Sequence, residues 1–362
     1  MADRQSIRLI SEAAFNPAKW VEVCDSLSAE ASSAGAILVP VSVSQRALGL
    51  PHSAELDGLV AAYVEGGWYR RDVRERSLPA LLRCGYVTDA DCIAYDEVGH
   101  SSYYQELLAR WGFRWFAGIA IQAEDTCWVL SLQRGLHAQP FSEAEIGNLL
   151  AYRNLLNSSA SIARQLGFAY IRGASDIFEH QGLSAIALDA DERVVYVSPT
   201  AEHHLRESLR LIGGRLHSRN GISAAPLNQL IRNICSRNGS ASRLDVCLYR
   251  PGDLLPLVVY GRTLPEAEYD LFKPATALLV ISDPQRPRQI PSALLADYFG
   301  LTPAETGLAV SMLRGVSLDQ HAINHSTSPV TVRNHLQALF RKTSTHRQSD
   351  LLVAMNRILL VP

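Results

Sequence analysis

The final part of the chain has the clearest alternation of apolar and polar positions, and from Leu301 to Pro362 it predicts four short helices. Thr302-Pro303-Ala304-Glu305 has the features of a helix start: threonine at the N-cap, proline in the first turn and glutamate three positions after the cap. Ser317 and Ser328 begin two further helices, and Gln348–Leu360 is the fourth. Short, closely spaced helices of this kind predict a small all-α domain.

The third of these helices is amphipathic. Its apolar positions form a single stripe, at i, i+4, i+7 and i+8: Val332, Leu336, Leu339 and Phe340. Arg333, Asn334 and Gln337 lie on the opposite side, and the helix carries no acid. Arginine bonds bidentately to guanine, and asparagine or glutamine to adenine, so this face predicts double-stranded DNA as a partner.

Two α/β segments precede the helices. In residues 1–168 we expect a helix at Pro17–Ser33, a strand at 35–43 and a hairpin of Arg114–Gln122 with Cys127–Gln133. A capping box at Ser142 and Glu145 predicts a long helix that continues to about Leu166.

The second segment covers residues 172–285. A hairpin of 185–189 with 193–197 precedes a helix at Pro199–Leu209. Later strands are expected at Ser242–Tyr249, Leu257–Gly261 and Ala277–Ser282. The prolines near 284–291 predict a linker at 286–296, followed by the helical domain at 297–362. The chain is therefore expected to be a multidomain α+β protein.

Composition narrows the class further. A chain of 362 residues is too long for one compact core, and its 47% hydrophobic content excludes a disordered protein. The net charge is −2, but residues 291–362 contain six Lys/Arg against four Asp/Glu and are slightly basic. The N-terminus has no apolar signal region, and no apolar run is long enough for a membrane span, so we expect a cytoplasmic protein with no membrane partner.

Motifs for catalysis are absent from the sequence. It contains no phosphate-binding glycine loop, no nucleophile elbow, no zinc-spaced Cys/His set and no paired CxxC. His203, His204 and His217 are more simply solvated or hydrogen-bonded histidines than metal or haem ligands. We therefore expect neither an enzyme nor a bound cofactor or metal.

The helical tail resembles a known domain. Leu301-Thr-Pro-Ala-Glu305, Thr331-Val-Arg-Asn-His-Leu336 and Phe340-Arg-Lys342 occur in the order and spacing of the LuxR-type (GerE-like) helix-turn-helix domain of bacterial transcription regulators. The sequence departs from that family at His321, His325, Ser326 and Thr327. Ser326 replaces a glycine, so it has to accept whatever left-handed backbone the turn imposes.

The resemblance assigns roles to individual residues. It implies that Arg333, Asn334 and Gln337 read bases in the major groove. The DNA backbone would be contacted by Ser328, Thr331, His335, Arg341, Lys342 and Arg347. In that family the fourth helix pairs two domains, which implies a homodimer through Leu351, Met355 and Ile358, and RNA polymerase as a further partner if the protein is an activator.

The upstream segments resemble sensory domains, the first GAF-like or autoinducer-binding-like and the second PAS-like. Four of the five tryptophans lie between residues 68 and 128, and a pocket for a small ligand is predicted from Tyr63, Trp68, Tyr69, Asp72, Trp111, Trp115 and Trp128. Tyr63, Trp68, Tyr69 and Asp72 resemble the aromatic-plus-aspartate signature of acyl-homoserine-lactone receptors, although the spacing differs and Val73 replaces the expected proline. Most of these aromatic residues are better explained as ordinary core, with the tips of Tyr and Trp reaching the surface.

Three hypotheses stay open at this stage. The first is a dimeric, ligand-responsive transcription regulator. The second is a regulator with the same architecture that responds to protein contact or binds DNA constitutively. The third is a cytosolic sensory or dimerisation protein with a degenerate helix-turn-helix that no longer binds DNA.

Overall fold

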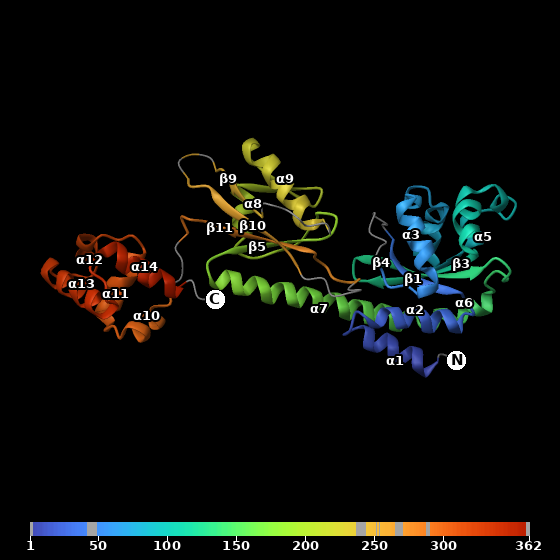
Figure 1. Cartoon of the computed structure of the whole chain (residues 1–362), viewed down its shortest axis with the longest axis horizontal. Coiled ribbons are helices and arrows are strands. Elements are labelled where there is room, and N and C mark those ends of the chain that lie inside the picture. The colour runs from blue at the N-terminus through green and yellow to red at the C-terminus, as the bar shows by residue number, and fades with distance from the viewer. Residues whose placement is uncertain are drawn as a thin grey trace.

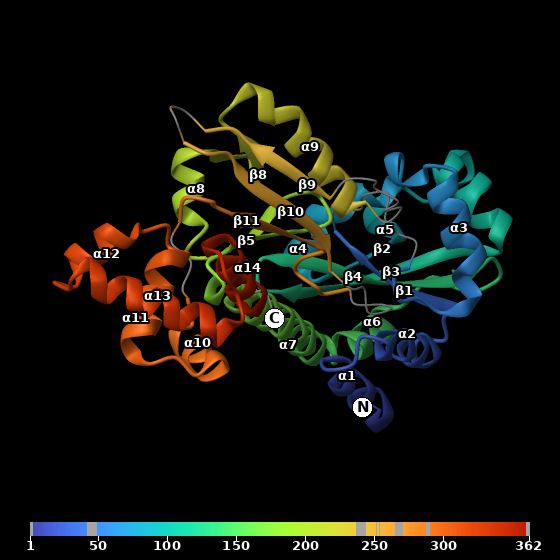
Figure 2. The same ribbon diagram turned by 60° about the vertical axis from the view of Figure 1, so that its left-hand side comes forward.

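A computed structural model describes residues 3–41, 49–236, 244–250, 252, 254–264, 271–286 and 290–359. Two large antiparallel sheets with flanking helices are joined by one long helix, α7 (Arg153–His180), and a helical part follows them (Figure 1). β7 (Leu209–Ile212) and β8 (Arg215–Ser218) form a separate two-stranded sheet. This arrangement confirms the predicted multidomain α+β class. Figure 1 shows α10–α14 gathered at one end of the molecule, and Figure 2 shows the same helices after a turn of 60°.

The N-terminal part is built on a four-stranded sheet in the order β1-β4-β3-β2. Its strands are β1 (Gly35–Pro40), β2 (Tyr86–Thr88), β3 (Phe113–Ala123) and β4 (Thr126–Gly135). β3 and β4 form the predicted hairpin, with Ala123 opposite Thr126. Of the strand predicted at 35–43, residues 42 and 43 lie outside the described residues.

Helices cover both faces of this sheet (Figure 1). One face packs against α1 (Arg4–Ala13), α2 (Lys19–Glu30) and the first half of α7, around Trp20, Leu130 and Leu132. The other face lies beneath the remaining short elements: η1 (Ala54–Leu56), α3 (Asp57–Glu65), η2 (Trp68–Arg70), η3 (Val73–Ser77), α4 (Leu78–Cys84), α5 (Asp89–Cys92), η4 (Val98–His100), η5 (Tyr103–Leu108) and η6 (Ala109–Trp111).

The prediction of one continuous helix from Ser142 to about Leu166 is wrong. The capping box of Ser142 and Glu145 is present and begins α6 (Glu143–Leu150), but the chain turns at residues 151 and 152 before α7 begins. Tyr152 is buried at this turn, where its hydroxyl donates to Glu30 over 2.6 Å. α7 then continues through the predicted boundary near residue 168 and reaches the second sheet.

The middle part holds a five-stranded sheet in the order β6-β5-β11-β10-β9. The elements are β5 (Ser184–Leu188), β6 (Val194–Val197), α8 (Glu202–Glu207), β7 (Leu209–Ile212), β8 (Arg215–Ser218), α9 (Gly221–Cys235), β9 (Asp245–Leu248), β10 (Leu257–Thr263) and β11 (Ala277–Ser282). α9 covers one face of the sheet and the end of α7 covers the other (Figure 1). Residues 242 and 243 of the strand predicted at Ser242–Tyr249 lie outside the described residues.

The two sheet-bearing parts also touch through Leu271 and Phe272. Phe272, which follows β10 in sequence, packs in the N-terminal core with its ring centre 4.9 Å from that of Trp20 and 5.2 Å from that of Trp128. The predicted division at residues 168–172 therefore separates segments that share both α7 and a hydrophobic contact.

The C-terminal part contains the four predicted helices: α11 (Pro303–Leu313), α12 (Leu318–Asn324), α13 (Pro329–Thr343) and α14 (Gln348–Leu359). The capping box of Thr302 and Glu305 is present, and Ser317 and Ser328 cap the next two helices. A further helix, α10 (Ser292–Phe299), begins inside the predicted linker and places Leu295 in the same core. Residues 287–289 of the linker and 360–362 at the end of the chain lie outside the described residues.

Candidate functional site

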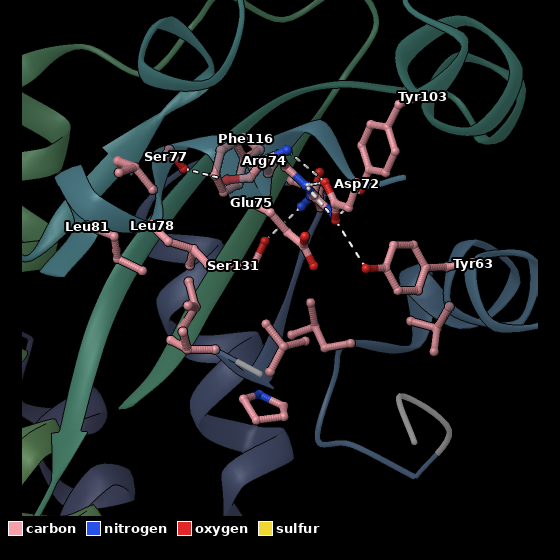
Figure 3. Close-up of a pocket in the computed structure, with 18 of the residues that line it drawn as sticks. Tyr63, Asp72, Arg74, Glu75, Ser77, Leu78, Leu81, Tyr103, Phe116 and Ser131 are labelled. Carbon is pink, nitrogen blue, oxygen red and sulfur yellow. Dashed lines mark hydrogen bonds and ion pairs between the residues drawn. The ribbon is translucent and has the colours of Figure 1, made fainter. Parts of the chain in front are cut away.

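A cavity lies between the N-terminal sheet and the short helices on the face opposite α1, α2 and α7 (Figure 3). Its volume is about 120 Å³, several times the 10–15 Å³ or so that one water needs, so it has room for a small organic molecule. Most of its walls are apolar: Ile37, Val39, Pro40, Val41, Leu56, Leu59, Val60, Leu78, Leu81, Val87, Phe116 and Val129. The polar lining consists of Tyr63, Asp72, Arg74, Glu75, Ser77, Tyr103, Ser131 and Gln133.

Asp72 is the centre of the polar end. The Arg74 side chain donates from Nε to Oδ1 over 3.0 Å and from Nη2 to Oδ2 over 2.9 Å, and its backbone N–H adds a third bond. The hydroxyls of Tyr63 and Tyr103 each donate to Oδ2 over 3.1 Å. Figure 3 shows both rings directed at this carboxylate. A carboxylate has about four lone-pair positions, so these donors occupy Asp72 completely.

The protonation states follow from burial and from the nearby charges. Burial opposes ionisation of Asp72, but the Arg74 guanidinium and its hydrogen bonds outweigh burial and lower the pKa of this carboxyl. Burial raises the pKa of Tyr103 well above its usual value, and the Asp72 charge adds to this rise while the Arg74 charge opposes it. Burial, followed by the Asp72 charge, also raises the pKa of Tyr63. Asp72 is therefore an ionised acceptor that is held by two protonated phenols and a guanidinium.

Gln133 is a free acceptor at the cavity. Its Nε2 donates to Ser131 Oγ over 2.9 Å, whereas its buried Oε1 has no hydrogen-bond partner among the described residues. β4 alternates, so that Val129, Ser131 and Gln133 face the cavity while Leu130 and Leu132 belong to the opposite core. Because an unpaired buried carbonyl is costly, a ligand that donates a hydrogen bond here gains affinity.

The structure brings only two of the predicted pocket residues, Tyr63 and Asp72, to the cavity. Trp68 packs edge-on against Tyr103 and lies under the Arg71 guanidinium, and the Tyr69 ring lies beneath Arg70. The remaining predicted residues lie elsewhere: Trp111 is exposed, Trp115 stacks on Tyr95 and donates to the Ala138 carbonyl, and Trp128 packs on Phe272. These five assignments are corrected, because aromatic content alone does not distinguish the wall of a cavity from an ordinary core.

Sequence reasoning missed the other polar cavity residues, notably Arg74, Tyr103, Ser131 and Gln133. One signal was available. Ser131 and Gln133 are polar residues two positions apart that alternate with the apolar Leu130 and Leu132, so they mark one face of the strand as something other than packed core.

A second candidate site is the exposed face of α13. Val332, Leu336 and Leu339 are buried as predicted, and Arg333, Asn334 and Gln337 are exposed on the opposite side. Ser326 adopts the left-handed backbone with φ of 51°, so serine does accept the conformation that the tight turn requires. The helix-turn-helix pair and its outward polar face are therefore both present.

The predicted backbone contacts differ in how accessible they are. Arg341 and Arg347 are exposed, and His335 is half-buried. Ser328 is exposed and Thr331 is half-buried, and the two are bonded to each other, because the Ser328 hydroxyl caps the helix by accepting the Thr331 N–H over 3.0 Å.

The assignment of Lys342 to the DNA backbone has to be corrected. Its Nζ lies 2.7 Å from Glu305 Oε2 and donates to the Gly300 carbonyl over 2.6 Å. The lysine therefore ties α13 to the start of α11. Arg341 is exposed beside it and is the better candidate for a phosphate contact.

The predicted dimer surface is also corrected. Leu351 and Met355 have no exposed area, because both side chains fill the core between α11, α13 and α14. Ile358 remains partly exposed, and Val353 is a large exposed apolar residue on the same helix. Any pairing through α14 has to use these outer positions.

No model of a known protein family matches this sequence, and no curated protein matches it. Among solved structures, the VqsR LBD domain from Pseudomonas aeruginosa overlaps 43% of this chain and 92% of its own, with 18% identity and a TM-score of 0.34. A phage VqmA-DPO complex overlaps 54% of this chain and 92% of its own, with 14% identity and a TM-score of 0.22. A VqmA-ligand-DNA complex from Vibrio cholera overlaps 49% and 82%, with 16% identity and a TM-score of 0.22. These similarities are too remote to establish a shared fold.

Within the described residues, no helix has the length and apolar character needed to span a membrane.

Proposed function

We propose that this protein is a transcription regulator that binds double-stranded DNA through α13 and responds to a small molecule held in the N-terminal cavity. The observation that carries the proposal is the exposed, acid-free polar face of α13, which follows a tight turn from α12. The resemblance of residues 301–342 to the LuxR-type domain supports the same conclusion. Catalysis is not part of the proposal.

Recognition of DNA would divide between two kinds of contact. Arg333, Asn334 and Gln337 are the candidate base readers, and each good bidentate contact discriminates against the wrong base by about 1–3 kcal/mol. Arg341 is the candidate phosphate contact, in place of Lys342. We also propose a homodimer in the cytoplasm that pairs through the outer face of α14, and RNA polymerase as a partner if the protein activates transcription.

The cavity suggests the class of ligand. Its apolar walls suit a small, mainly apolar molecule, and the unpaired Gln133 Oε1 suits a hydrogen-bond donor such as an amide or hydroxyl on that molecule. Asp72 is fully occupied by Arg74, Tyr63 and Tyr103, so a ligand would have to displace one of them to bond to it. We therefore propose Gln133 and Ser131, rather than Asp72, as the first polar contacts of a ligand.

A route from the cavity to the rest of the chain is also present. The sheet that lines the cavity packs on α7, and α7 continues to β5 of the middle part. Phe272 adds a second connection between the same two parts. A change in the N-terminal sheet would therefore reach the middle part through two packed contacts.

The test is fluorescence anisotropy of the full-length protein with genomic duplexes. Wild-type protein should bind some duplexes tightly, and Arg333→Ala should relax that preference by about 1–3 kcal/mol. Arg341→Ala should weaken binding to all duplexes alike and reduce the salt slope by about one. Arg83→Ala, which changes an exposed arginine on α4 of the N-terminal part, is the matched control and should change neither quantity.

Absence of duplex binding at low ionic strength would overturn the proposal. Equal effects of Arg333→Ala and Arg83→Ala would remove α13 as the reading helix. Native mass spectrometry of freshly purified protein tests the ligand separately, by the mass of any molecule that remains bound.

A second candidate function is a sensory protein whose helical part binds another protein rather than DNA. Ile323 and Val330 favour it, because they are 70% and 64% exposed on either side of the turn between α12 and α13. The anisotropy experiment separates this candidate from the first, since a C-terminal part that binds protein rather than DNA shows no preference among duplexes.

A further inference from the structure

His204, on α8 of the middle part, is a buried histidine without a hydrogen bond. Its side chain is 1% exposed, and neither ring nitrogen has a partner among the described residues. Buried polar side-chain atoms are nearly always paired, and leaving one unpaired costs about 1–3 kcal/mol. The imidazole is therefore positioned for a partner that the protein chain does not supply.

Two further metal-binding side chains lie beside it. His203 is the preceding residue on α8, and Asp283 follows β11 in sequence. One ligand atom from each of His203, His204 and Asp283 lies within 4.8 Å of the other two. Two of the three groups are neighbours on one short helix, and the third comes from a distant part of the sequence.

The Asp283 carboxylate retains acceptor capacity despite its ion pair. Oδ1 accepts from Arg250 Nη2 and from the Gln285 N–H, over 2.9 and 3.0 Å. Oδ2 accepts from Arg250 Nη1 over 3.0 Å. Since each carboxylate oxygen has two lone pairs, Oδ2 has one available for a further contact.

We propose that His203, His204 and Asp283 form a binding site for a divalent transition metal ion such as Zn²⁺. Two imidazoles and one carboxylate are a donor set that such ions prefer. Small side-chain rotations suffice to bring three atoms within 4.8 Å of each other to the bond length of about 2.0–2.2 Å around one ion. Glu207, whose carboxylate lies 3.3 Å from His203 Nε2, can orient that imidazole or join the ligands.

Nearby cations set a limit on the affinity. Arg250 is paired with Asp283, and the charges of both Arg250 and Arg286 act on His204. Positive charge near the site opposes the binding of a cation, so we expect a dissociation constant of roughly micromolar order rather than the much tighter binding of structural zinc sites.

The location gives such an ion a role in regulation. Asp283 begins the segment that runs from β11 to α10, the first helix of the C-terminal part. An ion held by α8 and Asp283 would fasten the start of that segment to the middle part. Metal binding would then restrict how the C-terminal part is held, independently of what that part binds.

The experiment is isothermal titration of untagged, full-length, chelator-treated protein with Zn²⁺, with Co²⁺ absorption as a second readout. Wild-type protein should bind one ion at this site, and His203→Ala and Asp283→Asn should each weaken binding at least tenfold. His203 is exposed, so His203→Ala retains the fold, which circular dichroism checks. His204→Ala should abolish binding but also changes the core.

Two control variants separate this site from adventitious binding by other histidines. His217→Ala changes a histidine of the same part on β8, and His325→Ala changes an exposed histidine in the turn before α13. Neither should affect the titration. The proposal fails if wild-type protein binds no Zn²⁺ below about 100 µM. It also fails if His203→Ala binds as tightly as the two controls.

Discussion

Two buried aspartate–arginine pairs hold different parts of this molecule, and they are built differently. Asp72 and Arg74 are two residues apart, whereas Arg250 and Asp283 are brought together from the end of β9 and the end of β11. Asp72 also receives hydrogen bonds from Tyr63 and Tyr103. Besides the two Arg250 bonds, Asp283 receives only the Gln285 N–H among the described contacts.

The difference shows what each pair contributes. The first pair is local, and Asp72 has further hydrogen-bond donors besides the Arg74 side chain. It therefore shapes one end of the cavity without joining distant elements. The second pair has few substitutes, and it joins the chain after β9 to the end of β11, where the chain leaves for the C-terminal part. Removing the arginine should therefore have unequal effects at the two sites.

The largest effect is expected for Arg250→Met. It leaves the Asp283 carboxylate, which is 9% exposed, without its cation, and breaking such a buried pair costs about 3–5 kcal/mol. Hydrogen exchange of the β9, β10 and β11 amides measures the loss in the middle part. Arg250→Met combined with Asp283→Leu should recover part of the stability, because no unpaired charge remains. No recovery would mean that packing rather than charge dominates.

Arg74→Met should cost less, about 1–3 kcal/mol, because the two tyrosine hydroxyls and the backbone N–H of residue 74 still donate to Asp72. All five tryptophans lie in the N-terminal part, so denaturation followed by tryptophan fluorescence reports on this region. A larger loss than that of Arg250→Met would contradict the comparison.

Gln133→Leu tests the cavity beside the first pair. The substitution removes a buried carbonyl oxygen that has no partner, so unliganded protein should be unchanged or more stable by up to about 1 kcal/mol. Gln122→Leu, on the exposed side of β3, is the matched control and should lack this gain. Thermal unfolding of both variants provides the measurement. A loss well above the roughly 1 kcal/mol that the Nε2–Ser131 bond contributes would show that Oε1 has a partner in solution.

The smallest effect is expected from pH in the C-terminal part. Burial, followed by the charges of His325 and His335, lowers the pKa of His321, whose Nδ1 lies 2.8 Å from Ser311 Oγ on α11. Its folded pKa is below its unfolded value, so this stability is present above about pH 6.5 and lost as the pH falls below it, at no more than about 1.4 kcal/mol per pH unit. Asp72 and Asp283, whose pKa values are lowered from 3.8, stay ionised in that range.

Protection factors of the α11–α13 amides at pH 7.5 and 5.5 measure this effect, and His321→Leu is the control. Wild-type protein should lose protection at the lower pH, and the variant should lose less. Equal losses would exclude His321 as the group responsible.

The sequence predicted regular elements best where local signals were strong. The capping residues Thr302, Ser317 and Ser328 located α11, α12 and α13, and the alternation of β3 and β4 located their hairpin. It missed α10, which begins after Pro291 in what reads as a linker, and α9, which contains Pro226. In both cases tertiary packing of residues such as Leu295 and Leu230 outweighs weak local signals.

The candidate sites show the same division. The outward face of α13 follows from helical periodicity, so Arg333, Asn334 and Gln337 were predictable. The internal pairing of Lys342 with Glu305 was not, because it depends on how α13 crosses α11. The cavity depends on side chains from many elements, and only Tyr63 and Asp72 were identified before the strands and helices were placed together.

The position of Phe272 has a practical consequence for dissecting the protein. A fragment that stops at residue 168 would strip this ring from Trp20 and Trp128 and would sever α7 midway. Such a fragment would expose the apolar rings of Trp20 and Trp128 to solvent and would aggregate. A fragment of residues 3–286 keeps the packing of Phe272 on Trp20 and Trp128, and it is a better starting point for crystallisation or ligand screening.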